Sequence, residues 1–340
     1  MNRPWLAPLV PLYAVGVAAR GLGLKLGWEP VRHLCWPVIS VGNLSTGGAG
    51  KTPFATALAR LLAVEGYSVD ILSRGYGRKS NEPARVLVEG SVDQFGDEPL
   101  LIARETGLPV YVAPQRYDAG LLAESEFDAS RQHISRDGQS NRAHILDDGF
   151  QHRQLARDVD VLLLNRRDWQ DTLLPGGNLR EGLHAVMRAD VIAIPADDPE
   201  LETQLRGWGW KGPVWRWHRR MEIPAIDGPV LAFCGIALPE QFFNGLEQAG
   251  LRLVAPTAFR DHHRFTAQDM QTLVSLARSA RATALITTEK DAVRLGDLVS
   301  GFPATLPLKT AQLRIEIQNE TAVIAWLVSR LSASPASPPL

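Results

Sequence analysis

Residues 38–62 read VISVGNLSTGGAGKTPFATALARLL and contain, in order, an apolar segment, a glycine-rich turn, a Lys-Thr pair and an amphipathic segment. The apolar segment, 38–41, predicts a short buried strand. The segment after the Lys-Thr pair predicts a helix, because its apolar residues recur at three- and four-residue steps, namely Phe54, Leu58, Leu61 and Leu62. This order of parts is typical of a phosphate-binding loop.

The turn supplies groups that can bind a nucleoside triphosphate. Its glycines allow backbone N–H groups to converge on an anion at the positive end of the next helix. Lys51 is expected to neutralise the β- and γ-phosphates of ATP, and Thr52 to hold Mg²⁺. Ser45 replaces the first glycine of the full pattern, which leaves the GGxGK[ST] form. A purely structural glycine turn is the alternative, but it does not explain the Lys-Thr pair. The predicted nucleotide-binding residues are Ser45, Thr46, Gly47, Gly48, Ala49, Gly50, Lys51, Thr52 and Pro53.

Composition limits the function classes. The chain has 340 residues, 45% of them hydrophobic, which exceeds what one core usually serves and predicts two domains. Its net charge of −1 argues against a nucleic-acid partner, because no basic excess is available to follow a phosphodiester backbone. Cys35 and Cys234 lie far apart without metal-ligand spacing, which is typical of a reducing compartment and argues against structural zinc.

Residues 4–19, PWLAPLVPLYAVGVAA, form an uncharged apolar run next to Arg3 and Arg20. The run is shorter than the roughly 20 residues of a membrane span and contains two prolines. A signal peptide would export a nucleotide-binding loop, which makes little sense. We therefore expect a helix in a membrane interface, with Trp5 and Tyr13 at headgroup level, over a helix packed on the protein's own core.

Charged residues follow two of the predicted strands. Strand 68–72 ends in SRGYGRK, where Arg74 and Arg78 are candidates for anion contacts, although a solvated turn alone explains the pattern better. Asp147 and Asp148 follow an apolar strand end, the position that supplies the acidic Mg²⁺ ligand in phosphate-loop phosphotransferases. An ordinary chain reversal is the alternative for Asp-Asp-Gly, but downstream of a phosphate loop we favour metal binding. In FGDEP (95–99), the pattern alone predicts that Asp97 caps the following helix.

The predicted fold is α/β, with a P-loop NTPase-type mostly parallel sheet wrapped by helices and a second, smaller α/β domain. The strands expected in the first domain are 38–41, 68–72, 109–113, 145–146, 159–164, 190–195 and 213–218. Residues 124–142 are polar and aperiodic, so we expect a surface excursion with little structure.

The second unit begins near Pro229. Its expected strands are 230–233, 251–254, 284–287 and 306–308, and its expected helices are 241–248 and 267–280. Trp215 and Trp217 alternate with polar residues on a strand near the junction, so both indoles should face the same way. A helix at 320–331, after Asn319 as its cap, precedes a tail expected to be disordered. The expected domains are residues 1–222 and 223–318, with 319–340 as terminal helix and tail.

Seven motifs in one order suggest a family. They are STGGAGKTP (45–53), SRGYGR (73–78), FGDEP (95–99), DDGFQH (147–152), LPGGNLRE (174–181), FRDHHRF (259–265) and TEKDAVR (288–294). Each motif is weak alone, but the ordered set covers almost the whole chain and resembles the tetraacyldisaccharide 4′-kinases, the lipid A 4′-kinases of Gram-negative bacteria. The resemblance covers the loop as well, because that family also uses the GGxGKT form.

The resemblance implies transfer of the γ-phosphate of ATP to the 4′-hydroxyl of a membrane-embedded acylated glucosamine disaccharide 1-phosphate, with Mg²⁺, at the cytoplasmic face of the inner membrane and without a required protein partner. Lys51 and Thr52 match the family's phosphate and Mg²⁺ ligands, and Asp147 and Asp148 match its acidic pair. The resemblance also implies that Asp97 and His262 act together as the catalytic base and that Glu181 is a further Mg²⁺ ligand. It further suggests Arg74, Tyr76 and Arg78 as substrate contacts.

Two other classes of ATP-using protein compete with this interpretation. A nucleotide-dependent switch ATPase also uses GGxGKT loops, but its dimeric members have lysine where this chain has Thr46. A kinase of a soluble metabolite leaves the apolar N-terminal run unexplained. A membrane-attached scaffold without turnover is the non-enzymatic alternative.

Overall fold

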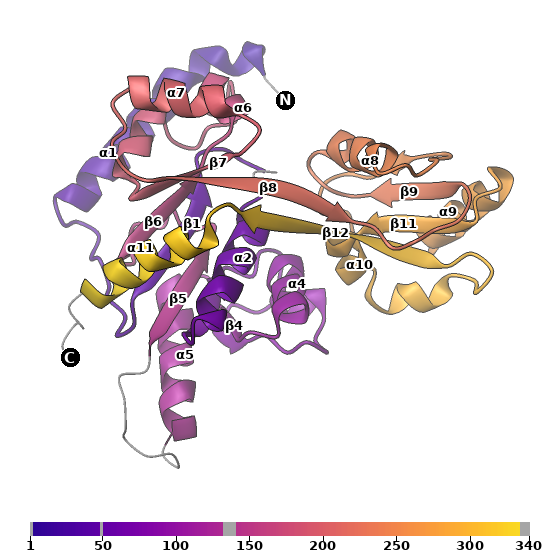
Figure 1. The fold of residues 1–340 in the computed structure, drawn as a ribbon, viewed down its shortest axis with the longest axis horizontal. Coiled ribbons are helices and arrows are strands. Elements are labelled where there is room, and N and C mark those ends of the chain that lie inside the picture. Colours follow the sequence, from indigo (N-terminus) through magenta and orange to yellow (C-terminus); the bar gives the residue numbers. More distant parts are fainter. Residues whose placement is uncertain (1–2, 48–49, 132–140, 334–340) are drawn as a thin grey trace.

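The computed structural model describes residues 3–47, 50–131 and 141–333. Within these ranges one mixed twelve-stranded sheet crosses the molecule in the order β10-β9-β11-β12-β8-β7-β6-β1-β5-β2-β4-β3 (Figure 1). Every neighbouring pair is parallel except β12 with β8 and β3 with β4. The predicted α/β class with a mostly parallel sheet is confirmed.

The larger body contains the strands that carry the phosphate-binding loop. Its strands are β1 (Val38–Asn43), β2 (Ser68–Ser73), β3 (Ala84–Arg85), β4 (Val110–Val112), β5 (Arg142–Asp147), β6 (Val159–Leu163), β7 (Val191–Pro195) and β8 (Val214–Glu222). Successive residues of one strand belong to different cores: Ile145 packs with the helices on one face, and Leu146 packs with those on the other. Both faces are therefore covered, as parallel strands require.

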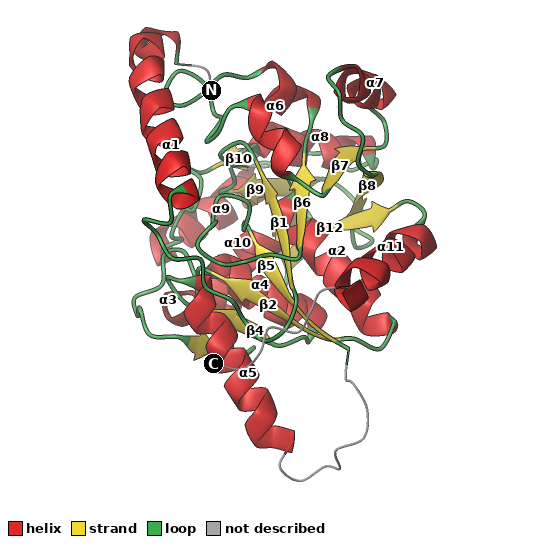
Figure 2. Ribbon diagram, turned by 90° about the vertical axis from the view of Figure 1, so that its left-hand side faces the viewer, coloured by secondary structure: helices red, strands yellow, loops and turns green. Residues whose placement is uncertain are grey.

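Helices cover the two faces of this body (Figure 2). One face packs against α2 (Lys51–Val64), α4 (Asp97–Thr106) and α11 (Glu320–Ala333). The other packs against α5 (Arg116–Arg131), η2 (Leu183–Arg188) and α7 (Pro199–Gly207). The remaining helices are η1 (Pro4–Leu9), α1 (Val10–Lys25), α3 (Val92–Phe95) and α6 (Arg166–Gln170).

The smaller lobe is a three-layer unit at the other end of the sheet. Its strands are β9 (Val230–Cys234), β10 (Thr257–Ala258), β11 (Ala284–Thr288) and β12 (Leu308–Ile317), and its helices are α8 (Pro239–Gln248), α9 (Ala267–Ser279), α10 (Glu289–Leu295) and η3 (Gly296–Gly301). Leu231 and Phe233 pack toward α9, whereas Val230 and Ala232 pack toward α8. The lobe thus buries both faces of its own parallel strands.

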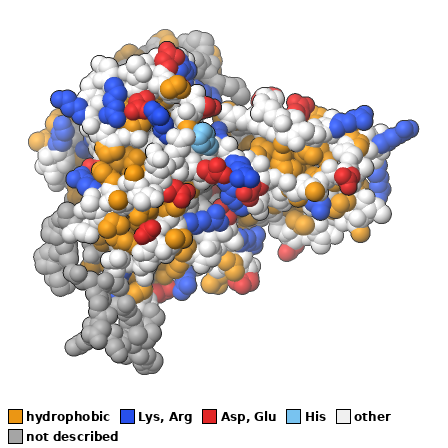
Figure 3. All heavy atoms as spheres, in the orientation of Figure 1, with side chains coloured by type: hydrophobic (Ala, Val, Ile, Leu, Met, Phe, Trp, Pro, Cys, Tyr) orange, Lys and Arg blue, Asp and Glu red, His pale blue; other side chains and the backbone are white. Residues whose placement is uncertain are grey.

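A long ribbon joins the two units. β8 and β12 run antiparallel from the Gln312–Glu222 pair to the Ile317–Trp217 pair (Figure 1). Trp215 and Trp217 are buried while Arg216 and His218 are exposed, so both indoles face the same core as predicted. Acidic and basic side chains lie together where the body meets the lobe (Figure 3), and the ribbon contributes the Arg220–Glu316 pair there. The domain boundaries remain predictions.

Four local predictions were wrong or incomplete. Residues 124–131 are the end of α5, where Phe127 packs edge-on against Trp36, and residues 132–140 lie outside the described part. Residues 251–254 make only one bridge, between Leu253 and Val230. The strand expected at 306–308 is β12, which is ten residues long because residues 308–311 pair with β11 and residues 312–317 pair with β8. α11 extends to Ala333, and the tail at 334–340 lies outside the described part.

The N-terminal apolar run is helical and lies at the edge of the molecule (Figure 2). The stretch Trp5–Lys25 is, by length and composition, long and apolar enough to cross a membrane, so the prediction that the apolar run is too short for a span was wrong; little of the stretch is buried. Trp5, Leu12 and Val15 are exposed, which argues against a helix packed on the protein's own core. Tyr13 differs from expectation, because it is partly buried and its hydroxyl donates to the Arg180 carbonyl at 3.1 Å.

Candidate active site

The phosphate-binding loop begins at the carboxyl end of β1. Gly47 and Gly50 have φ of +80° and +81°, a backbone conformation that favours glycine. Gly50 directly precedes α2, and its carbonyl accepts the first helical hydrogen bond, from the Phe54 amide at 3.0 Å. Pro53 occupies the first helical turn, where its missing N–H costs nothing. Gly48 and Ala49 lie outside the described residues.

A second loop, 173–181, holds the first part of the phosphate-binding loop. The Thr46 amide donates to the Asn178 carbonyl at 2.9 Å, and Ser45 bridges to Leu179. The Ser45 hydroxyl accepts from Asn43 Nδ2 at 2.9 Å. Ser45 therefore has a structural place in this loop that a glycine would not fill.

Lys51 reaches back across the loop toward β1. Its Nζ donates to Asn43 Oδ1 at 2.9 Å and lies 3.3 Å from Asp148 Oδ1. Both contacts hold the ammonium group at the mouth of the loop, where phosphate oxygens would compete for it. Asn43 was not singled out from the sequence, because asparagine at a strand end more often indicates a turn.

Thr52 and Asp147 come together as the sequence predicts. The Thr52 hydroxyl donates to both Asp147 carboxylate oxygens, at 3.0 and 3.2 Å. Burial, followed by the charges of Glu98 and Asp148, raises the pKa of Asp147 to about 7. The raised pKa means that the Asp147 carboxylate is unfavourable without a nearby positive charge. Mg²⁺ would supply that charge, and it is usually bound through one or two carboxylates together with phosphate oxygens.

Asp148 and Glu181 have arginine partners. Asp148 has a φ of +53°, and its carboxylate accepts from Arg180 Nη1 at 3.0 and 3.1 Å. Burial alone would raise the pKa of Asp148, but Lys51 and Arg180 outweigh it and lower that pKa. Glu181 accepts from Arg188 through both oxygens, at 2.7 and 3.2 Å. Among the described residues no group of three or more His, Cys, Asp or Glu side chains could hold a metal.

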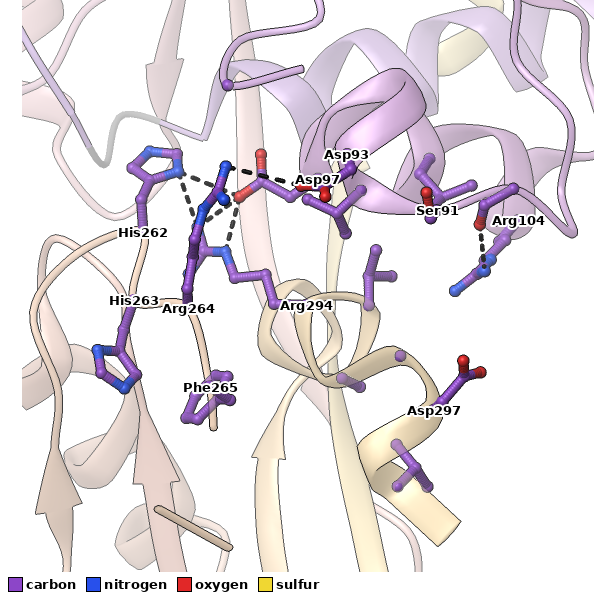
Figure 4. A pocket seen from close by; sticks show the side chains of 18 of the residues that line it. Ser91, Asp93, Asp97, Arg104, His262, His263, Arg264, Phe265, Arg294 and Asp297 are labelled. Atoms are coloured by element: carbon purple, nitrogen blue, oxygen red, sulfur yellow. Dashed lines mark hydrogen bonds and ion pairs between the residues drawn. The ribbon is translucent and has the colours of Figure 1, made fainter. Parts of the chain in front are cut away.

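The structure brings Asp97 and His262 together from residues 165 positions apart (Figure 4). Asp97 begins α4, and its Oδ1 accepts from the Glu98 amide, but it does not cap the helix in the usual way. Its Oδ2 lies 3.1 Å from His262 Nδ1. His262 has a φ of +58° and its amide donates to the Gly235 carbonyl, so a tight turn presents the imidazole to α4.

Arg294 completes this pair. Its guanidinium is buried and contacts Asp97 Oδ2 through Nε at 2.7 Å and Nη2 at 2.6 Å. Lys290 lies 3.9 Å from the same oxygen. Burial alone would raise the pKa of Asp97, but the hydrogen bond from His262 and the charges of Lys290 and Arg294 hold it well below its usual range. Asp97 is therefore a carboxylate that orients His262.

The ring nitrogen of His262 that lies away from Asp97 is Nε2. His262 Nδ1 lies 3.1 Å from Asp97 Oδ2 and 3.0 Å from Arg294 Nη2, so its protonation decides which of the two it binds. With its proton on Nδ1, His262 donates to Asp97 and not to Arg294, and Nε2 lies 4.0 Å from Asp261. Nε2 is then the atom that can accept a proton from a substrate. The pair borders a cleft of about 790 Å³ that Tyr76, Ser91, Arg264 and Asp297 also line (Figure 4).

Comparisons with known proteins show the family of the chain. The family model for tetraacyldisaccharide-1-P 4′-kinase matches residues 2–332. The chain belongs to the tetraacyldisaccharide 4′-kinase family. It is similar to the tetraacyldisaccharide 4′-kinases of Koribacter versatilis (40% identity, 94% of this chain and 97% of the relative) and Desulfotalea psychrophila (33%, 92% and 92%). It is also similar to the crystal structure of LpxK from Aquifex aeolicus in complex with ATP, with a TM-score of 0.73, 30% identity, and coverage of 96% and 98%.

The candidate substrate residues of this tetraacyldisaccharide 4′-kinase family member differ in their exposure to solvent. The Tyr76 ring is exposed and lies 5.5 Å from the His262 ring, and Arg74 is exposed. Arg78 points inward: Nη1 and Nη2 are buried without a hydrogen-bond partner in the described residues, and burial lowers its pKa. In this conformation Tyr76 and Arg74 are available to a substrate and Arg78 is not.

Three functional contacts in this family member were not found from sequence. Arg294 lies in the TEKDAVR motif, but nothing in that motif indicates a partner 197 residues away. Arg180 was noted only as part of a glycine-rich turn, and its pairing with Asp148 depends on the fold. Buried Arg116 donates to the Asp147 and Asp148 carbonyls at 3.3 Å, and its position at the start of α5 gave no signal.

Proposed function

We propose that this chain transfers the γ-phosphoryl group of ATP to the 4′-hydroxyl of a tetraacylated glucosamine disaccharide 1-phosphate, a step of lipid A synthesis. The observation that carries the proposal is the Asp97–His262 pair at 3.1 Å, next to a phosphate-binding loop. α4, which begins at Asp97, lies against α2, which begins at Lys51. Glu98, the neighbour of Asp97, is one of the charges that raise the pKa of Asp147 after burial. A sugar hydroxyl is a poor nucleophile, so a base at this position serves a kinase better than it serves a switch ATPase.

Each residue has one task in this reaction. The loop amides and Lys51 bind the phosphates and stabilise charge as it moves during transfer. Thr52 and Asp147 would hold Mg²⁺, which would offset the negative charge of the phosphates. Nε2 of His262 accepts the proton of the 4′-hydroxyl, and Asp97 stabilises the resulting imidazolium. Asp148 and Glu181 are proposed to support the metal site through their arginine partners, Arg180 and Arg188.

The N-terminal helix suits a substrate that stays in a bilayer. Exposed Trp5, Leu12, Val15 and Leu22 form an apolar surface on η1 and α1, next to Arg20 and Lys25. The same segment holds the 173–181 loop, because the Arg3 amide donates to the Gly176 carbonyl at 2.8 Å. We propose peripheral binding to the cytoplasmic face of the inner membrane, with no nucleic-acid partner and no required protein partner.

The proposal is tested by phosphoryl transfer in detergent micelles. Purified protein with γ-labelled ATP, Mg²⁺ and a tetraacylated disaccharide 1-phosphate should yield a labelled lipid whose new phosphate is at the 4′ position, and chelation of Mg²⁺ should stop it. The matched control is Lys211→Ala, an exposed lysine away from the loop, which should behave as wild type. ATP hydrolysis without labelled lipid, or equal transfer to a deacylated disaccharide, would favour the two competing classes.

A further inference from the structure

Arg314 on β12 joins carboxylates from three other elements. Its side chain is 18% exposed, and it lies 3.0 Å from Glu105 at the end of α4, 3.3 Å from Glu289 at the start of α10 and 3.6 Å from Glu222 at the end of β8. Its Nη2 also donates to Gln312 Oε1. One guanidinium therefore meets four acceptors.

Arg314 connects α4, which carries Asp97, with α10, which carries the Asp97 partner Arg294. At the first turn of α4, Asp97 pairs with Arg294 of α10 at 2.6 Å and Glu98 pairs with Lys290 at 2.7 Å. At the other end of α4, Arg314 lies between Glu105 and Glu289, the first residue of α10. α4 has ten residues and is therefore about 15 Å long. Because a helix this short moves as one unit, a displacement of its Glu105 end also displaces Asp97 at its other end.

The phosphate-loop helix is attached to the same point. Arg60 of α2 lies 3.3 Å from Glu105 Oε1 and donates to the Glu105 carbonyl at 2.7 Å. A small cavity of about 150 Å³, bordered also by Glu320, lies beside this cluster. The cluster of Arg60, Glu105, Glu289 and Arg314 consequently connects three helices. These are α2, α4 and α10, which carry Lys51, Asp97 and Arg294.

The charges of the cluster depend on Arg314. Burial raises the pKa of both Glu105 and Glu289, and the charges of Glu289 and Glu222 raise the pKa of Glu105 further, whereas Arg314 lowers both. Without the arginine, two largely buried carboxylates would repel one another, and leaving such charges unpaired is strongly unfavourable. At high pH they would separate the two helices, and at low pH one of them would take up a proton.

We propose that Arg314 is a positioning residue for the kinase reaction: it holds the end of α4 against the start of α10 and thereby sets the place of Asp97 relative to His262 and the phosphate-binding loop. This inference rests on the proposed function. Arg314 does not touch the reacting atoms, so its effect should fall on the rate of transfer and not on binding of ATP.

The test compares Arg314→Met and Arg314→Lys with Arg220→Met, which removes an exposed ion pair from the same ribbon. In the micelle transfer assay, Arg314→Met should lower kcat about 10- to 100-fold with a change of less than threefold in KM for ATP. Lysine should restore part of kcat, and Arg220→Met should stay within twofold of wild type. The loss in Arg314→Met should be larger at high pH, where both carboxylates are ionised, than at low pH, where one of them takes up a proton.

Glu105→Gln keeps the test decisive if Arg314→Met does not fold. This variant removes the α4 end of the connection and should lower kcat about fivefold with KM for ATP unchanged. A folded Arg314→Met or Glu105→Gln variant with kcat within twofold of wild type at every pH would overturn the inference while leaving the proposed function intact. Absence of lipid phosphorylation by the wild-type protein would overturn the proposed function and, with it, this inference.

Discussion

Lys51 lies between Asn43 and Asp148 and has two partners before any nucleotide binds. Asp148 also pairs with Arg180, so it keeps a counter-ion when Lys51 is removed. The fold should therefore tolerate the loss of the lysine, whereas the developing charge of the transferred phosphoryl group should not. The role of Lys51 is thus expected to be electrostatic and specific to the reaction.

Lys51→Ala should lower kcat about 10²- to 10³-fold, the usual effect of removing one preorganised donor from a transition state. Its thermal unfolding temperature should change by only a few degrees. Steady-state kinetics in micelles and thermal unfolding of the same preparation measure both. Normal kinase activity in a well-folded Lys51→Ala protein would contradict the assignment of the loop.

Asp147→Asn should stabilise the nucleotide-free protein at pH 8 and much less at pH 5. The pKa of Asp147 is about 7 in the folded protein, against 3.8 ordinarily. The folded state therefore binds more protons than the unfolded state between these values, and stability falls as pH rises through this range. Asparagine removes that loss, of the order of 2 kcal/mol, and abolishes activity.

The unfolding free energies of wild type and Asp147→Asn should be compared at both pH values with a chelator present. Asp227→Asn, a change in a surface loop, is the control. A stabilisation that is the same at pH 5 and pH 8 would show that the Asp147 carboxyl does not titrate between them. Adding Mg²⁺ and ATP should then raise the unfolding temperature of wild type only.

At the scale of elements, α1 has two different sides. One side contacts the 173–181 loop through Tyr13 and through Val10, which lies next to Gly176, and the other exposes Leu12, Val15 and Leu22. The loop that α1 contacts also carries Arg180, the partner of Asp148. The membrane-facing segment and the nucleotide site are therefore neighbours through one loop.

Deletion of residues 1–25 should release the protein from anionic vesicles, and so should glutamate at Leu12, Val15 and Leu22 together. High salt alone should release little, because burial of apolar surface dominates over charge attraction. Co-sedimentation measures all three, with glutamate at exposed Leu87 as the control. A deleted protein that still sediments with vesicles would place the membrane contact elsewhere.

His144 on β5 provides a pH-dependent contribution to stability. Burial alone would lower its pKa, but Asp70 at 2.7 Å and Glu124 at 3.4 Å outweigh burial and raise it to about 9. A raised histidine pKa gives stability that is fully present below pH 6.5 and is lost as pH rises through about 9.

The unfolding free energy of wild type should therefore fall between pH 6.5 and 9 by an amount of the order of 2 kcal/mol. His144→Gln should be less stable at pH 6.5 and should lack most of this slope. Denaturant unfolding at several pH values measures it. An unchanged slope in His144→Gln would assign the pH dependence to other groups.

Sequence reasoning succeeded where the deciding interactions are local. β1, the glycine turn and α2 were predicted because the strand, turn and helix signals lie within 25 residues, and α11 because its apolar stripe is continuous. It was incomplete where distant partners decide. The length of β12 was underestimated because its residues 312–317, among them Arg314, are stabilised by pairing with β8 and by carboxylates far along the chain. The same distance concealed the pairing of Arg294 with Asp97.

At the scale of the whole molecule, one continuous sheet connects the nucleotide-binding body with the lobe that carries His262 (Figure 1). The chain passes between the two units through β8 and β12, and the Asp97–Arg294 and Glu98–Lys290 pairs are among the direct contacts between them. Asp97 comes from the body and His262 from the lobe. Asp97 and His262 can therefore act together only when the body and the lobe are positioned so that the two side chains touch.

The account therefore depends most on Asp97 and His262 acting as one base. The direct measurement is a double-mutant cycle of kcat in the micelle transfer assay, using Asp97→Ala, His262→Ala and the combined variant, with His263→Ala as the neighbouring control. We predict that each single change lowers kcat far more than it raises KM for ATP, and that the combined variant is little worse than the poorer single one, as for residues that function as a unit. Losses that sum as free energies, with an acidic limb of the pH profile that stays in place in His262→Ala, would contradict this account.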